Sequence, residues 1–392
     1  MTTTASPSIA AADFLDFESL LTGAEQTKLE QTREFLAAEV TPICVEYWNK
    51  AEFPHQLIPK LAEQDVISLV KNYGYSYLFA GLMHAEFTRA DTSVGTFLGV
   101  HDALFTGTIE TLASEEQQKR WLPEIYALEK VGAFGLTEPE AGSDIAGGAR
   151  TTAVKSGDDW ILNGAKRWIG NATFSDWVVI FAKDEADGQL KAFMVDTASL
   201  GYSATKIENK VSLRIVQNAD IVLDNVRVPE ENRLAGANSF KDTNKVLKDT
   251  RLGVAWQAVG QQMAAFDVAR AYALERKQFG RPIGSFQLIQ DQLVQIMGNL
   301  SASTAMLTQL AGVQQKGELT DAQSALAKQF ASARMRESVA LARSILGGNG
   351  IVADYHAAKI FADAEAIYTY EGSNEVNTLI VGRALSGIGA IV

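Results

Sequence analysis

Apolar residues recur every three to four positions between residues 14 and 127, a period typical of amphipathic helices. Ser114 and Gln117 form a capping box ahead of the segment EEQQKRWLPEIYAL, which predicts a helix start at that point. The pattern therefore predicts an N-terminal helical domain over residues 1–130. The period is shown by Leu29, Phe35, Leu36 and Val40.

The pattern changes between roughly Val131 and Val228. Short segments rich in branched and aromatic residues follow one another, separated by the turn clusters SGDD and EADG. We predict a middle β domain, a barrel or sandwich, over residues 131–242. Its expected strands include WILNGAKRW, WVVIFAK, KAFMVD and ADIVLDNVRVP.

Helical periodicity returns from Thr243 onward in three long segments whose lengths suit a four-helix bundle. We predict this bundle over residues 243–392. The expected fold class is α+β, with a helical domain, a β domain and a helical bundle in chain order. The three segments begin at TRLGVAWQ, FQLIQDQL and LTDAQSAL.

Composition excludes several classes of partner. The chain has 392 residues, 47% of them hydrophobic, and its net charge of −12 arises from 47 acidic and 35 basic residues. No basic run could neutralise several phosphates, so we expect no nucleic-acid partner. No stretch approaches the roughly 20 apolar residues of a membrane span, and the start lacks a secretory leader, so we expect a cytoplasmic protein.

Metal and thiolate chemistry are also not expected. Cys44 is the only cysteine, which rules out an intrachain disulfide and favours a buried apolar role. Four histidines lack the spacing of a zinc or metalloprotease motif, so we predict no metal site. They are His55, His84, His101 and His356.

A carboxylate near the C-terminus has an unusual setting. Glu371 stands between Tyr370 and Gly372, in an expected loop just before a helix that begins near Ser373. Desolvation among aromatic residues would raise its pKa, which suits a general base acting on a weak carbon acid. Alternatively, Glu371 only complements the helix dipole and Gly372 only makes the turn.

Other segments combine glycine with polar or aromatic residues. FGLTEPEAGSD, Phe134 to Asp144, could present N–H groups and hydroxyls to a cofactor, or could be an interdomain turn. Trp168 in KRWIGN could cover a planar ring or belong to the core. In ERKQFGRPIGSFQ, Arg276 precedes a helix stop, and LGGNG is a glycine-rich break between helices.

The order and spacing of these segments resemble the acyl-CoA dehydrogenase family, which includes acyl-CoA oxidases and glutaryl-CoA dehydrogenases. The resemblance covers nearly the whole chain from about Glu25 to the end. It is carried by GLTEPEAGSD, KRWIGN, VRVPEEN, ERKQFGRPI, LGGNG and YTYEGS, in that order.

The resemblance implies an FAD cofactor shared between subunits of a homo-oligomer, usually a tetramer arranged as a dimer of dimers. Phe134, Leu136 and Thr137 would hold the edge of the flavin ring, Gly142 and Ser143 the pyrophosphate, and Trp168 with Ile169 would lie over the flavin. Ser373 and Glu375 match further cofactor contacts. A neighbouring subunit would contribute Arg276, Gln278, Phe279, Ile283, Phe286, Gln287, Gly347 and Gly348.

The resemblance also implies the chemistry. Glu371 matches the catalytic base that removes a proton alpha to a thioester while FAD accepts a hydride from the beta carbon. The other family location for the base holds Thr250, and Arg251 would lie near the acyl group. The expected substrate-binding residues are Ser143, Arg251, Tyr370, Gly372, Gly95 and Gly99.

Three departures narrow the expected substrate and acceptor. Gly170 replaces a hydroxylated residue near flavin N5, and Val216 and Asn218 replace small hydroxylated residues, features closest to plant peroxisomal short-chain acyl-CoA oxidases. Gly95 and Gly99 stand where glutaryl-CoA dehydrogenases carry an arginine and a serine. A distal carboxylate would then be buried without a partner, which disfavours glutaryl-CoA.

We therefore expect an acyl-CoA dehydrogenase acting on an unbranched short- to medium-chain acyl-CoA and passing electrons to electron-transferring flavoprotein. One alternative is a short-chain acyl-CoA oxidase that uses O2, which Gly170 favours by opening space beside the flavin. Against it, the chain ends in GAIV without a peroxisomal address of the SKL type. The other alternative, a non-catalytic flavoprotein homologue, is opposed by the joint presence of Glu371, Arg276, Thr137 and Trp168.

Overall fold

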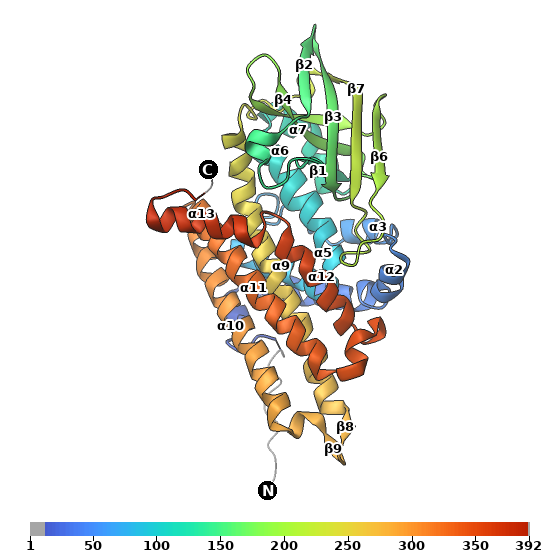
Figure 1. Cartoon of the computed structure of the whole chain (residues 1–392), viewed down its shortest axis with the longest axis vertical. Coiled ribbons are helices and arrows are strands. Elements are labelled where there is room, and N and C mark those ends of the chain that lie inside the picture. The colour runs from blue at the N-terminus through green and yellow to red at the C-terminus, as the bar shows by residue number, and fades with distance from the viewer. Residues whose placement is uncertain (1–11, 391–392) are drawn as a thin grey trace.

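The computed structural model describes residues 12–390 and has three parts in chain order (Figure 1). The first part is helical, as predicted. This helical part packs against the sheet on one side and against the long C-terminal helices on the other. Its helices are α1 (Gly23–Phe35), α2 (Cys44–Lys50), α3 (Leu57–Ala62), α4 (Tyr77–Ala90), α5 (Thr92–Leu98), α6 (Gly107–Leu112) and α7 (Glu115–Tyr126).

The predicted capping box at the start of α7 is confirmed. Ser114 Oγ accepts a hydrogen bond from Gln117 N at 3.2 Å, and Gln117 Oε1 accepts one from Ser114 N at 2.9 Å. These bonds satisfy two N–H groups that a helix start would leave unpaired. The helix then buries Trp121, Leu122 and Ile125 on one face, at the apolar spacing seen in the sequence.

The middle part is a seven-stranded sheet in the order β1-β4-β2-β3-β7-β6, with β5 paired to β4, and a short helix α8 (Ile145–Gly148). The four predicted strand segments correspond to β3, β4, β5 and β7. Alternate residues of β7 are buried, the period expected of a strand with one face in a core. The strands are β1 (Gly132–Gly135), β2 (Thr152–Ser156), β3 (Asp159–Ile169), β4 (Trp177–Asp184), β5 (Leu190–Asp196), β6 (Tyr202–Lys206) and β7 (Ala219–Pro229).

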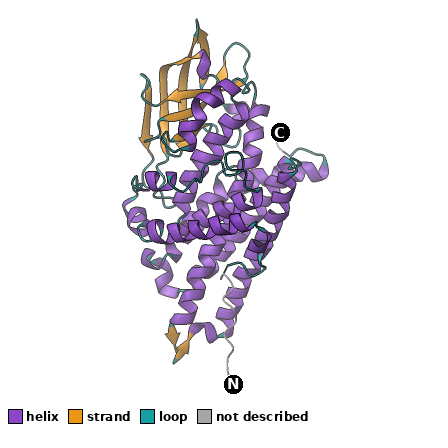
Figure 2. Ribbon diagram, turned by 180° about the vertical axis from the view of Figure 1, so that it is seen from behind, coloured by secondary structure: helices purple, strands orange, loops and turns teal. Residues whose placement is uncertain are grey.

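The third part contains the three long helices that the sequence predicted, followed by two shorter ones. A two-stranded hairpin joins α9 to α10 at the end of the molecule farthest from the sheet (Figures 1 and 2). No helix within residues 12–390 is long and apolar enough to cross a lipid bilayer. The elements are α9 (Phe240–Glu275), β8 (Lys277–Gln278), β9 (Arg281–Pro282), α10 (Gln287–Gln315), α11 (Asp321–Ile345), α12 (Ala357–Thr369) and α13 (Asn374–Ser386).

The sheet is joined tightly to the N-terminal helices. Gly132 N, at the start of β1, donates to His101 Nδ1 at 3.0 Å. A Cβ on Gly132 would lie 1.9 Å from the ring of Phe105, so only glycine permits this approach. The predicted α+β fold class, with its helical, β and helical parts, is confirmed.

Candidate active site

Glu371 lies in the loop between α12 and α13, as predicted. Glu371 and Gly372 both adopt left-handed backbone conformations, with φ of 55° and 79°. Ser373 is the N-cap of α13 and accepts a hydrogen bond from Val376 N at 3.3 Å, while Glu375 lies exposed in the first turn. A non-glycine residue with positive φ is held by its surroundings, and such positions concentrate at functional sites.

The Glu371 carboxylate faces α9. Thr250 Oγ1 donates a hydrogen bond to Glu371 Oε2 at 2.7 Å. Burial raises the pKa of Glu371, and Thr250 together with the charges of Arg251 and Lys328 offsets part of that rise. The carboxylate is therefore a stronger base than one in water, as proton abstraction from carbon requires.

The main-chain N–H of Glu371 is a second functional group of this loop. Among residues 12–390 it donates to no acceptor, whereas Tyr370 N donates to Ala366 O at 2.9 Å to end α12. A free N–H beside a basic carboxylate can donate to the carbonyl of a substrate whose alpha proton the carboxylate removes.

Arg251 follows Thr250 on α9 and is 8% exposed. Its Nη1 pairs with Asp321 at the start of α11, and its Nε has no partner among the described residues. The arginine thus adds positive charge next to Glu371 while its guanidinium is anchored to a neighbouring helix.

The side chain of Tyr370 lies in a group of polar side chains beside the Glu371 loop. Its hydroxyl donates to Gln257 Oε1 at 2.5 Å and lies 3.5 Å from Thr96 Oγ1. Gln257 is two helical turns beyond Thr250, so both project from one face of α9. Gln257 was not identified from the sequence.

Gly95 and Gly99, two of the three predicted substrate-binding glycines, lie at helix contacts. A Cβ on Gly95 would lie 2.6 Å from Thr88 Oγ1 and 3.0 Å from Thr88 N, so α5 approaches α4 too closely for a side chain. A Cβ on Gly99 would lie 3.0 Å from Gln257 Nε2, which also donates to Gly95 O at 3.2 Å. The Gln257 amide thus occupies the side of Gly99 where a serine side chain would project.

Trp168 lies near the end of β3 with its ring presented to solvent. The residue is 54% exposed, has φ of 67°, and its ring centroid lies 5.2 Å from the guanidinium carbon of Arg167. Thr137 Oγ1 donates to Arg167 O at 2.7 Å, and Arg167 N donates to Thr137 O at 2.9 Å, which ties the loop after β1 to β3. An exposed indole fixed beside a polar loop fits a flat aromatic cofactor.

A buried ion pair beneath this loop was not identified from the sequence. Lys166 Nζ donates to Glu138 Oε1 at 2.8 Å and to Leu136 O at 3.0 Å, and both side chains are almost fully buried. Glu138 also accepts from Arg150 N and Thr151 N, at 2.6 and 3.0 Å. The pair fixes both ends of the segment that carries the exposed Gly142 and Ser143.

Three predicted cofactor residues direct their side chains into hydrophobic cores. Phe134 packs edge-on against Phe181, with ring centroids 5.0 Å apart, and Leu136 belongs to the same cluster. Ile169 is 2% exposed in a neighbouring cluster. Any contact of Phe134, Leu136 or Ile169 with a cofactor would therefore come from the main chain.

The remaining predicted cofactor residues lie at the other end of the molecule. They surround the β8–β9 hairpin and the end of α11, far from Trp168 in the same chain (Figure 1). Phe279, at the tip of the hairpin, is 93% exposed. This set comprises Arg276, Gln278, Phe279, Ile283, Phe286, Gln287, Gly347 and Gly348.

Gly170, next to Ile169, is enclosed by apolar side chains. A Cβ there would lie 3.0 Å from Val100 Cγ2 and 3.8 Å from Val216 Cγ1. The valine that departs from the family pattern at position 216 is thus a neighbour of the glycine that departs at position 170. Two of the departures noted in the sequence therefore form one apolar contact.

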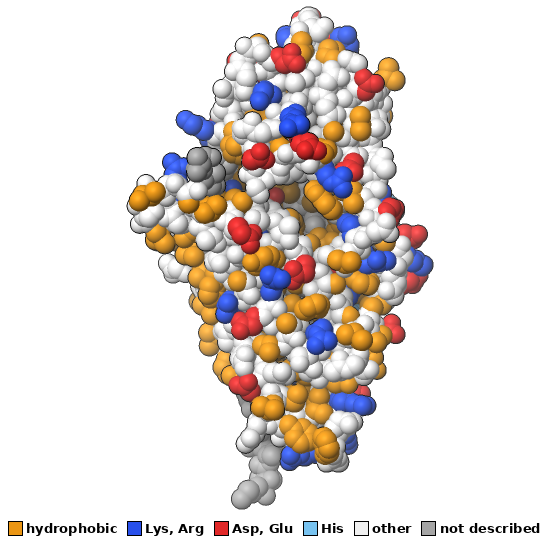
Figure 3. Space-filling view, in the orientation of Figure 1, with side chains coloured by type: hydrophobic (Ala, Val, Ile, Leu, Met, Phe, Trp, Pro, Cys, Tyr) orange, Lys and Arg blue, Asp and Glu red, His pale blue; other side chains and the backbone are white. Residues whose placement is uncertain are grey.

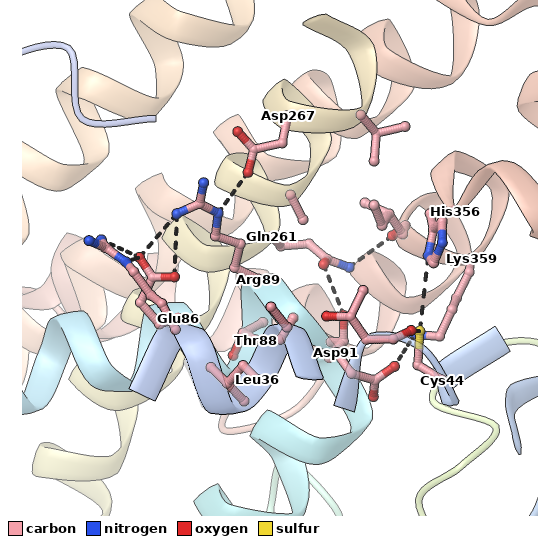
Figure 4. A pocket seen from close by; sticks show the side chains of 18 residues that line it. Leu36, Cys44, Glu86, Thr88, Arg89, Asp91, Gln261, Asp267, His356 and Lys359 are labelled. Carbon is pink, nitrogen blue, oxygen red and sulfur yellow. Dashed lines mark hydrogen bonds and ion pairs between the residues drawn. The ribbon is translucent and has the colours of Figure 1, made fainter. Parts of the chain in front are cut away.

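The surface is hollowed between the sheet and the helical parts, at the level of the α12–α13 loop (Figures 1 and 3). A separate cavity of about 360 Å³ lies between α4, α9 and α12 (Figure 4). Its charged groups pair with one another: Arg89 with Glu86 and Asp267 at 3.1 and 2.7 Å, and Lys359 with Asp91 at 2.7 Å. None of the predicted site residues lines this second cavity.

Comparisons with known proteins agree on one family. Family models described as the N-terminal, middle and C-terminal domains of acyl-CoA dehydrogenase match residues 22–129, 133–226 and 240–386. A 3-(aryl)acrylate reductase of Clostridium sporogenes is 35% identical over 90% of this chain and 96% of its own. The caffeyl-CoA reductase-Etf complex subunit CarC of Acetobacterium woodii is 34% identical over 92% and 98%.

Solved structures give the same result. A glutaryl-CoA dehydrogenase of Mycobacterium smegmatis in complex with FADH2 superposes with a TM-score of 0.94 and 29% identity, over 98% of this chain and 100% of that one. Butyryl-CoA dehydrogenase of Megasphaera elsdenii superposes with a TM-score of 0.89 and 30% identity, over 93% and 98%. The chain therefore belongs to the acyl-CoA dehydrogenase family of oxidoreductases.

Proposed function

We propose that this enzyme oxidises an unbranched short- to medium-chain acyl-CoA thioester to the trans-2-enoyl-CoA, with Glu371 as the general base. The observation that carries the proposal is the Glu371 group itself. It combines a carboxylate of raised pKa, a hydroxyl donor 2.7 Å away on Thr250 and a main-chain N–H that has no acceptor in the described part of the chain. Butyryl-CoA dehydrogenase, a structural neighbour, acts on a substrate of this class by its name.

The family neighbours, including the structure with FADH2, indicate FAD as the cofactor. When bound, FAD supplies the hydride acceptor for the beta carbon. The exposed indole of Trp168 and the polar loop around Thr137 fit its flavin end, and Gly142 and Ser143 are proposed for the pyrophosphate. The Glu371 N–H would donate to the thioester carbonyl, where charge develops as the alpha proton moves to the Glu371 carboxylate.

The distribution of the proposed cofactor residues supports a shared site. One set surrounds Trp168 and the other surrounds the β8–β9 hairpin at the opposite end of the chain, so one FAD can contact both only across two subunits (Figure 1). We propose a homo-oligomer, a tetramer by analogy with the family, in which each hairpin completes a neighbour's FAD site.

We propose that the hydrogen-bonded pair Tyr370–Gln257 limits the length of the acyl chain. Replacing Gln257 with glycine should remove the amide beside Gly99 and free the Tyr370 hydroxyl. Because the substitution empties the space beside Gly99 that the amide occupies, we expect the ratio of kcat/KM for octanoyl-CoA to that for butyryl-CoA to rise roughly tenfold. Gln329→Gly on the neighbouring helix is a control for helix destabilisation, and an unchanged ratio in Gln257→Gly would contradict the assignment.

Two electron acceptors are open to test. Electron-transferring flavoprotein is proposed, since the relative CarC is named as a subunit of a complex with Etf. The second candidate is direct oxidation by O2, which the sequence favoured because Gly170 would open space beside the flavin. In the structure a Cβ at Gly170 would lie 3.0 Å from Val100 Cγ2 and 3.8 Å from Val216 Cγ1, so apolar side chains occupy that side of Gly170.

A single experiment tests substrate and acceptor together. The purified enzyme is mixed without oxygen with butyryl-, hexanoyl-, octanoyl- and glutaryl-CoA, and the loss of flavin absorbance is followed before air is admitted. We expect fast bleaching by unbranched monoacyl esters, slow bleaching by glutaryl-CoA and slow recovery in air. Rapid recovery with peroxide release would establish the oxidase, and no bleaching by any ester would refute the proposed function.

A further inference from the structure

Lys328, on α11, is a fully buried cation without a carboxylate partner. Its side chain is 0% exposed, and no acidic oxygen of the described residues lies within 4.0 Å of its Nζ. Burying an unpaired ammonium group is costly. The position therefore needs a reason other than core packing.

The hydrogen bonds of Lys328 link the two ends of the loop that carries Glu371. Its Nζ donates to Tyr368 O and to Gly372 O, each at 2.8 Å. Tyr368 O is one of the carbonyls left without a helical partner at the end of α12, and Gly372 O also accepts from Asn377 Nδ2 at 2.8 Å. Lys328 thus ties the end of α12 to the start of α13 and holds the positive-φ residues between them.

The charge of Lys328 also acts on Glu371. Burial lowers the pKa of Lys328 to about 8, and the carboxylates of Glu371 and Glu375 oppose that shift while Arg251 adds to it. Among these groups, Glu375 is exposed and Arg251 is paired with Asp321. Lys328 is therefore the cation near Glu371 that forms no ion pair with any residue from 12 to 390.

We propose that Lys328 is a positioning residue for the base, which fixes the main chain around Glu371 and supplies the positive charge that keeps its carboxylate ionised. This inference rests on the proposed role of Glu371. Lys328 touches neither substrate nor cofactor in this assignment, and acts only through Glu371 and its loop.

The expected pH effect has a definite sign. The base must be ionised to accept a proton, so kcat/KM falls as pH drops through the pKa of Glu371. Removing a nearby positive charge destabilises the carboxylate and raises that pKa. The acid limb of the pH profile should therefore move to higher pH, by roughly one unit for the loss of one nearby charge in a partly dry site.

The test compares Lys328→Met and Lys328→Gln with Arg334→Gln, which removes a charge from a half-buried position of the same helix that pairs with Glu337. Anaerobic flavin bleaching by butyryl-CoA is measured against pH in FAD-loaded enzyme. We expect the acid limb to move upward by roughly one unit in both Lys328 variants and to stay in place in Arg334→Gln. An unmoved acid limb in FAD-loaded Lys328→Gln would overturn the proposal.

A double-mutant cycle measured by thermal unfolding tests the same interaction in variants that fail to retain FAD. Melting temperatures are compared for the apoprotein forms of wild type, Lys328→Met, Glu371→Gln and the double variant. If the two charges interact, Lys328→Met lowers the melting temperature less in the Glu371→Gln background than alone. Additive losses would refute the interaction, whereas absence of bleaching in the wild type would refute the function of Glu371 and leave this measurement standing.

Discussion

Replacing Glu371 with glutamine is expected to slow flavin bleaching by butyryl-CoA by roughly a thousandfold while FAD remains bound. Glutamine has nearly the same shape and can still accept a hydrogen bond from Thr250 Oγ1, so the loop geometry should persist. It cannot accept the alpha proton, because a neutral amide is a very weak base. The loss should therefore appear in the bleaching rate rather than in the affinity for acyl-CoA.

The rate is measured by mixing enzyme and substrate without oxygen and following flavin absorbance, with acyl-CoA binding titrated separately. Glu365→Gln is a matched control, since Glu365 is half-exposed on α12 and pairs with Arg336 at 2.8 Å. We expect it to bleach at nearly the wild-type rate. Bleaching of Glu371→Gln within a few-fold of wild type would rule out this carboxylate as the base.

The helical parts were predictable because long amphipathic periods determine which face is buried. The segments that became α9, α10 and α11 repeat apolar residues over many turns. β1, with the sequence GAFG, is four residues long and β8 and β9 are two each, too short for a period to be read. These strands form because neighbouring elements pair with them.

The position of Glu371 was predictable for a local reason. Tyr370, Gly372 and Ser373 are its sequence neighbours, and the serine marks the helix start that bounds the loop. The groups that act on Glu371 or build the site around it are distant in sequence. Lys328 bonds Gly372 at a separation of 44 residues and Gln257 bonds Tyr370 at 113.

One sequence feature could have indicated Lys328. It interrupts an otherwise small and apolar stripe of α11 in which Ala325, Ala327 and Ala331 are all buried. A lone lysine within such a stripe must either extend to the surface or find buried acceptors. Sequence periodicity cannot distinguish these outcomes, because the acceptors are carbonyls of another segment.

Replacing Lys166 with methionine is expected to lower the free energy of unfolding by roughly 3–5 kcal/mol and to weaken FAD retention. The change leaves Glu138 buried, with only the Arg150 and Thr151 N–H groups as donors. Burial raises the pKa of Glu138, and at present Lys166 and the hydrogen bonds more than offset that rise. Because the pair fixes the segment from Leu136 to Thr151, the loop at the proposed flavin site should loosen with it.

The stability loss is measured by thermal and denaturant unfolding, and FAD retention by absorbance after gel filtration. Lys155→Met is the matched control, since Lys155 pairs with Glu230 while both side chains are more than 40% exposed, and such pairs contribute at most about 1 kcal/mol. Adding Glu138→Gln to Lys166→Met should recover part of the loss, because it removes the unpaired charge yet keeps an acceptor for one backbone N–H. Equal stabilities for Lys166→Met and Lys155→Met would show that the buried pair does not support this loop.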